Sequence, residues 1–130
     1  PHFFCKPRPK FKADRDRIRS AMLSRNPKFF FGSDSAPHPR SSKECAEGEA
    51  GVFSASVAMS LLAGLVEEYG LQYRIEEFTS KFGWEFYHLA DNDADEIEIV
   101  KKPWHVPPSM YFGHIIPFMA GETLTWSWEQ

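Results

Sequence analysis

The run Lys28-Phe29-Phe30-Phe31-Gly32 constrains the fold of this chain more than any other segment. It is continuously apolar rather than alternating, which is typical of a strand buried on both faces in a parallel sheet. A helix is expected just before it, over residues 13–25, where apolar residues recur at helical spacing until Asn26-Pro27 ends the pattern. A helix, a turn and a buried strand in that order indicate an α/β fold.

The length of the chain limits how that fold could be completed. Its 130 residues allow one domain. A complete (β/α)8 barrel takes about 250 residues, so a barrel here would have to be part of one. The chain also begins with Pro1-His2 rather than an initiator Met, as expected of a processed product or a fragment.

The remaining elements follow from turn signals and apolar spacing. Residues 1–12 are rich in proline and are expected to form a loop. The long polar segment 33–53 is of the kind that is usually functional in a compact domain. Two helices are expected over 54–83, the first capped by Ser54 or Ser56 and ended by Gly70, the second ended by Gly83. Residues 84–130 are expected to form an extension with an acidic turn at Asp91 to Glu96, a strand at Ile97 to Val100 and an alternating strand at Thr123 to Trp128.

Charge and cysteine content exclude several classes of protein. Residues 1–43 carry 11 Lys and Arg against 3 Asp, and the rest carry 4 against 15 acidic residues. No aromatic or zinc-finger pattern accompanies the basic third, so a nucleic-acid partner is not expected. The longest apolar stretch is far short of the roughly 20 residues that span a bilayer, so no membrane partner is expected. Two cysteines and no signal peptide favour a reducing, cytoplasmic location.

Asp34 is the first candidate for chemistry. It lies just past the carboxyl end of the expected buried strand, where α/β folds place their active sites. An aspartate there could equally cap a turn through its own backbone. His38, four residues on, could be a surface histidine, and Arg40 and Lys43 would suit either an anionic substrate or a solvated surface.

A metal site built from this chain alone has little support. There is no His-x-His or Cys-x-x-Cys pair, and the set His2, Cys5, His38 and Cys45 has irregular spacing. Serine chemistry has no better support, because Asp34 stands where a nucleophile elbow requires Ser.

The stretch FFGSDSAPHPRSSKECAEGEAGVFSA, from Phe30 to Ala55, resembles the segment around the last barrel strand of free-standing dihydroorotases. PHFFCKP at the start resembles that family's loop after the seventh strand, and IPFMAGETLTWSW resembles its C-terminal signature. The resemblance implies the C-terminal part of a TIM (β/α)8 barrel of the metal-dependent amidohydrolase type, with 28–32 as the eighth strand and a short C-terminal extension. It also implies two zinc ions per site, a homodimer, and the reversible hydrolysis of dihydroorotate to N-carbamoyl-L-aspartate in pyrimidine biosynthesis.

The resemblance carries roles to four positions. Asp34 matches the catalytic aspartate, a general acid and base that lies beside the metals and counts among their ligands. His38 matches the histidine that binds the substrate carboxylate. Ala50 and Lys6 match positions whose backbone groups contact the substrate. The family's His-x-His pair, carboxylated lysine and further zinc-binding histidines have no counterpart in these residues, so the chain alone is expected to be inactive and to bind no stoichiometric zinc.

Two alternatives stay open. One is another cyclic amidohydrolase, such as a dihydropyrimidinase or hydantoinase, against which the Ser-Ala-Pro-His loop argues. The other is a non-catalytic, truncated product that serves as an interaction piece, which the missing histidine set favours. In either case the apolar faces at Phe29 to Phe31 and Val57 to Tyr69 predict exposed hydrophobic patches and marginal stability for the isolated chain.

Overall fold

Helix α1, Lys12–Leu23, occupies the place where a helix is expected over 13–25. The structure is a computed structural model that describes residues 1–8, 11–89 and 96–129. The helix ends at Ser24, whose hydroxyl donates to the carbonyl oxygen of Ala21 at 2.7 Å, and Arg25 then turns with a positive φ of 61°. No residue of α1 is buried, and Ile18 on its apolar face is 67% exposed. The described residues therefore leave Ile18 uncovered, while Ala21 and Met22 on the same face are half-buried.

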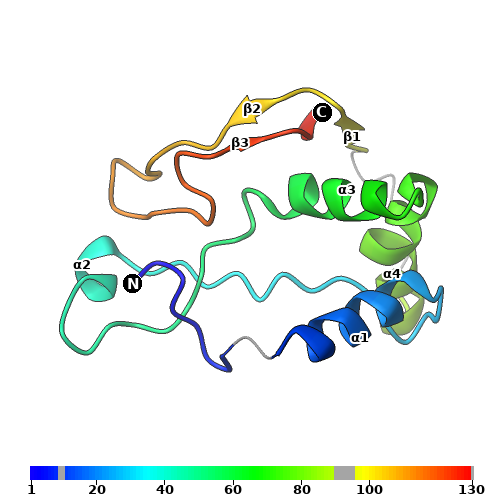
Figure 1. Ribbon diagram of the computed structural model, residues 1–130, viewed down its shortest axis with the longest axis horizontal. Coiled ribbons are helices and arrows are strands. Elements are labelled where there is room, and N and C mark those ends of the chain that lie inside the picture. The colour runs from blue at the N-terminus through cyan, green and yellow to red at the C-terminus, as the bar shows by residue number, and fades with distance from the viewer. Residues whose placement is uncertain (9–10, 90–95, 130) are drawn as a thin grey trace.

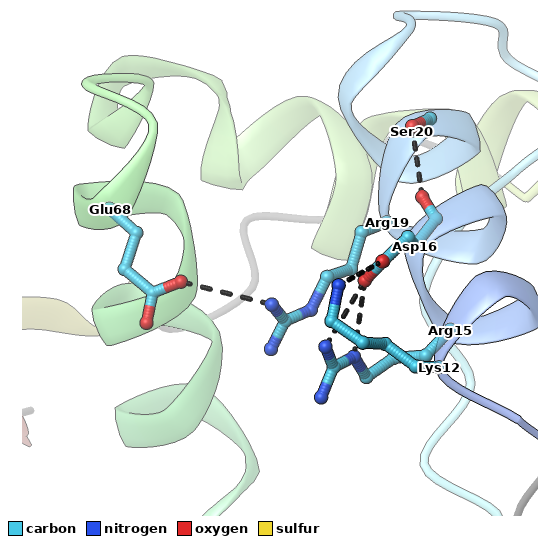
Figure 2. A network of polar contacts seen from close by, with 6 residues as sticks. All are labelled: Lys12, Arg15, Asp16, Arg19, Ser20 and Glu68. Carbon is cyan, nitrogen blue, oxygen red and sulfur yellow. Dashed lines mark hydrogen bonds and ion pairs between the residues drawn. The ribbon is translucent and has the colours of Figure 1, made fainter.

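The charged side chains of α1 pair largely with each other (Figure 2). Lys12 and Arg15 both reach the Asp16 carboxylate, at 2.9 and 3.2 Å. The hydrogen bond from Lys12 is the main reason that the pKa of Asp16 is lowered. The Arg19 guanidinium lies 3.9 Å from the Glu68 carboxylate, and this ion pair links α1 to the neighbouring helix α3, Ala58–Glu68. These exposed pairs contribute little stability. They place much of the basic charge of the chain on a solvated helix surface.

Residues 29–32 form no assigned strand, and Lys28 still lies in the preceding turn, so the strand predicted at 28–32 is not formed among the described residues. The one backbone hydrogen bond from this segment to a distant one runs from Phe31 N to Phe78 O, at 2.9 Å. Phe29 is 47% exposed. A strand needs a hydrogen-bonded neighbour along its length, and the described sheets contain no partner for this segment. They are two separate two-stranded antiparallel sheets, and the described residues form no closed barrel.

Helix α3 carries the first half of the core. Val57, Ala63 and Val66 are buried along its apolar stripe. The predicted serine cap is wrong: Val57 is the N-cap residue, with no side-chain cap bond, because the groups of Ser54 bond to a neighbouring loop instead. Gly70 ends the helix as expected, with a φ of 65° that lets Leu71 N donate to Val66 O at 2.9 Å.

The second predicted helix is present but does not stop at Gly83. A short turn η1 (Gln72–Arg74) and a π-helical turn η2 (Glu77–Lys81) lead into α4 (Phe82–Tyr87). Gly83 lies inside α4, where a methyl group would touch the Phe30 ring at 3.5 Å. The helix ends instead at His88, whose φ is 51°. Gly83 therefore lies beside Phe30 within the helix and does not end it.

The C-terminal region forms the two small sheets over α3 (Figure 1). β1 (Glu98–Val100) pairs with β4 (Ser127–Glu129), and β2 (Trp104–His105) pairs with β3 (Thr123–Leu124). The single strand predicted at Thr123 to Trp128 is thus two strands that belong to different sheets. Residues 91–95 of the predicted acidic turn lie outside the described residues. Leu124 and Val106 complete the core begun by Val57. Within the described residues, no helix has the length and apolar character needed to cross a membrane.

Candidate active site

Asp34 sits at a fixed bend in the chain after residues 29–32. It is exposed and has a positive φ of 44°, a conformation that aspartate tolerates better than most residues. Both of its neighbours are hydrogen-bonded to the segment that leads into α3. The Ser35 hydroxyl accepts hydrogen bonds from the amides of Ser54 and Ala55, at 3.1 and 3.0 Å. The Ser54 hydroxyl donates to Ser33 O at 3.3 Å. The backbone on either side of the carboxylate is therefore held while the carboxylate remains accessible.

His38 lies directly over Gly51. A methyl group at Gly51 would be 2.7 Å from the Ala36 carbonyl oxygen and 2.7 Å from Cδ2 of the His38 ring. Gly51 also has a φ of 153°, which side chains disfavour. Ala36 N donates to Val52 O at 2.9 Å, so the loops on either side run together. The structure therefore brings His38 beside the segment that contains Ala50.

The N-terminal loop joins the same place. Phe4 O accepts the Gly51 amide at 2.9 Å, and the ammonium group of Lys6 lies 5.8 Å from the centroid of the Phe4 ring. Figure 1 shows the N-terminal loop, the segment after Asp34 and the return toward α3 meeting near the short helix α2, Arg40–Lys43. Three of the predicted positions, Lys6, His38 and Ala50, thus belong to loops in mutual contact. Backbone hydrogen bonds and contacts of Lys43 and Phe4 join these loops. Among the described residues, the Asp34 side chain takes no part in these contacts.

Lys43 and Arg40 do not lend free positive charge to this loop, as an anion site would require. Arg40 binds both oxygens of Glu44, at 2.8 and 2.9 Å, and His2 reaches the same carboxylate at 2.9 Å. These bonds, that from Arg40 first, hold the pKa of Glu44 below its usual range. Lys43 is only 3% exposed and is turned inward. A lysine in a polar loop carries no sequence signal of burial, so sequence reasoning missed its position.

The described residues do not fit a zinc centre of their own. They contain no group of three or more His, Cys, Asp or Glu placed to hold a metal ion. The Cys5 thiol contacts Pro7 O at 3.6 Å and the Cys45 thiol contacts Ser42 O at 3.2 Å, while His2 is taken up by Glu44. The irregular set considered from the sequence is therefore not a metal site here, and Asp34 could supply one ligand at most.

Proteins similar to this chain include dihydroorotases from a plant and from bacteria. No protein-family model matches it. The mitochondrial dihydroorotase of Arabidopsis thaliana is 45% identical over 128 residues, which cover 97% of this chain and 34% of the relative. The dihydroorotase of Pseudomonas aeruginosa is 43% identical and is covered to 36%. The chain thus spans about a third of the length of the curated relatives it matches.

Solved structures agree with these relatives. A crystal structure of Saccharomyces cerevisiae dihydroorotase in complex with 5-fluoroorotic acid superposes with a TM-score of 0.92 at 40% identity, covering 99% of this chain and 37% of that one. The Campylobacter jejuni dihydroorotase gives a TM-score of 0.85 at 34% identity, covering 100% of this chain and 38% of the other. Sequence and fold together show that almost the whole of this chain is similar to about a third of a dihydroorotase.

Proposed function

We propose that this chain contributes the catalytic aspartate and part of the substrate pocket to a dihydroorotase, which reversibly hydrolyses the cyclic amide of dihydroorotate to N-carbamoyl-L-aspartate. The observation that carries the proposal is the contact at Gly51 between the loops that hold Lys6, His38 and Ala50. The neighbours of Asp34 are hydrogen-bonded to the continuation of the Ala50 loop, at Ser54 and Ala55. The similarity to a yeast dihydroorotase that holds 5-fluoroorotic acid, an orotate derivative, supports the same class of substrate.

Asp34 moves the proton in this proposal. An exposed carboxylate can accept a proton from the water that attacks the ring carbonyl, as the new carbon–oxygen bond forms. It then donates that proton to the amide nitrogen as the carbon–nitrogen bond breaks. The reverse cyclisation uses the same two transfers in the opposite order. The fixed backbone around Ser33 and Ser35 keeps the carboxylate in place for both.

The substrate is held by the loops around Gly51. The imidazole of His38 can bind the carboxylate of dihydroorotate, and the backbone groups of Ala50 and Lys6 can contact the ring amides. Backbone recognition explains how an exposed lysine can stand at a substrate position, since the Lys6 side chain is not what the ring contacts.

The proposed reaction uses two zinc ions, which the residues of this chain alone would not hold. A catalytic zinc takes about three protein ligands, and the described residues bring no such set together. The remaining ligands must come from the parts of a dihydroorotase that this chain does not span. The same parts would cover the exposed apolar faces and close the barrel. A homodimeric, cytoplasmic enzyme completes the proposal.

A comparison of substrates tests this function. The full-length protein that contains this sequence is expected to hydrolyse dihydroorotate and to leave dihydrouracil largely intact, because only dihydroorotate has a carboxylate for His38. The rates are measured by ultraviolet absorbance of the ring amide. Faster hydrolysis of dihydrouracil would favour a dihydropyrimidinase, and no hydrolysis of either would favour a non-catalytic interaction protein.

A further inference from the structure

Lys43 is a buried cation whose donors are all taken by backbone carbonyls. Its ammonium group has three N–H donors. They bond to Phe4 O at 3.1 Å, Glu49 O at 2.7 Å and Gly51 O at 2.6 Å. The Phe4 ring lies 5.9 Å from the same nitrogen. Burying a charge is costly unless it is fully hydrogen-bonded. Lys43 is only 3% exposed, so its three hydrogen bonds are what allow its charge to be buried.

The three acceptors belong to the two loops proposed to contact the substrate through their backbones. Glu49 and Gly51 lie on either side of Ala50, so Lys43 holds the carbonyls of both neighbours of that residue. Phe4 is two residues before Lys6, and its carbonyl also accepts the Gly51 amide. One ammonium group therefore fixes the spacing between the Ala50 loop and the Lys6 loop, with His38 packed over Gly51 beside them.

We propose that Lys43 is a positioning residue for substrate binding, which sets the backbone of Ala50 and of the N-terminal loop at the distance that the ring amides of the substrate require. The proposal rests on the proposed function. Lys43 does not itself touch the substrate, because its three donors are already occupied. Without the ammonium group, three inward-facing carbonyls lose their donor and the loops separate. Asp34 is held through Ser33, Ser35 and Ser54 instead, so proton transfer should be spared.

Lys43→Met in the full-length protein tests this role, since methionine keeps an unbranched apolar stem without the charge. KM for dihydroorotate is expected to rise by about tenfold or more, while kcat stays within about twofold of the wild-type value. Hydrogen exchange at 49–52 should become faster and exchange in α3 should not change. Lys81→Met, the same change at an exposed lysine of η2, serves as the control and should leave both constants unaltered.

A wild-type KM in folded Lys43→Met, or a fall in kcat with KM unchanged, would overturn the positioning role. If that variant does not fold, Lys43→Arg replaces it. The planar guanidinium cannot place its donors as a compact ammonium does, so KM should again rise, and a wild-type KM would count against the proposal. If the wild-type protein itself does not hydrolyse dihydroorotate, the proposed function fails instead.

Discussion

Gly51 shows how single residues shape the candidate site. Its conformation and the lack of a side chain allow the Ala36 carbonyl and the His38 ring to approach its backbone. The sequence pattern singles out Asp34 and His38 because they follow an apolar run and resemble a known motif. It does not show that Gly51 lies against the His38 ring or that Lys43 is buried, since a close approach and a buried ammonium group both depend on loops that meet only in the folded chain.

Gly51→Ala is expected to weaken substrate binding in the full-length protein. The added methyl group would overlap the His38 ring and Ala36 O, so the imidazole must move away from the proposed substrate carboxylate. KM for dihydroorotate should rise by about tenfold or more, because small misplacements at a site are costly. Steady-state kinetics check this. Gly64→Ala, at a helical position with open space, is the control, and equal KM values for the two variants would contradict the role of Gly51.

At the scale of elements, local patterns predict helices better than strands. The stripe of α3 and its end at Gly70 follow from residues close in sequence. The strand predicted at 28–32 has no hydrogen-bonded neighbour within the described residues, because strand pairing depends on segments far away in the sequence. The alternation at 123–128 suggests one strand, yet Trp104 donates to Trp126 O at 2.8 Å between β3 and β4, where the chain passes from one sheet to the other.

The contact between α3 and the C-terminal sheets is expected to depend on pH through Glu67. This carboxylate accepts hydrogen bonds from Lys101 and from Trp126 Nε1, and the bond from Lys101 is the main cause of its lowered pKa. A lowered pKa stabilises the folded state above the carboxylate's ordinary pKa, and this stabilisation is lost as pH falls through the lowered value.

Glu67→Gln should therefore shift the urea midpoint downward at about pH 7, and the difference from wild type should shrink toward about pH 3. Urea unfolding followed by tryptophan fluorescence at several pH values measures this. Glu76→Gln, at an exposed glutamate of the region between η1 and η2, provides the comparison. A difference that stays constant with pH would show that the Glu67 charge is not responsible.

At the scale of the whole molecule, the described residues bury a small core and expose many large apolar side chains. The buried hydrophobic residues are Val57, Ala63, Val66, Val106 and Leu124. Phe86 and Tyr87 are 60% and 62% exposed although both rings pack against Phe30. Of the two faces expected to be exposed, Phe29 in the first is 47% exposed, whereas Val57, Ala63 and Val66 in the second are buried. The described residues thus expose apolar patches at Phe29 and on α4. In the proposed function, the remainder of a dihydroorotase barrel covers them.

The proposed function requires that Asp34 transfers the proton in dihydroorotate hydrolysis. The most direct test is the kcat of Asp34→Asn in the full-length protein, because asparagine keeps the shape of the side chain but cannot carry the proton. We predict that kcat falls by at least about a hundredfold, the usual contribution of a general acid or base, while the circular dichroism spectrum is unchanged. Asp14→Asn on α1 should retain wild-type turnover. A kcat of Asp34→Asn close to that of the wild type would show that Asp34 does not transfer the proton.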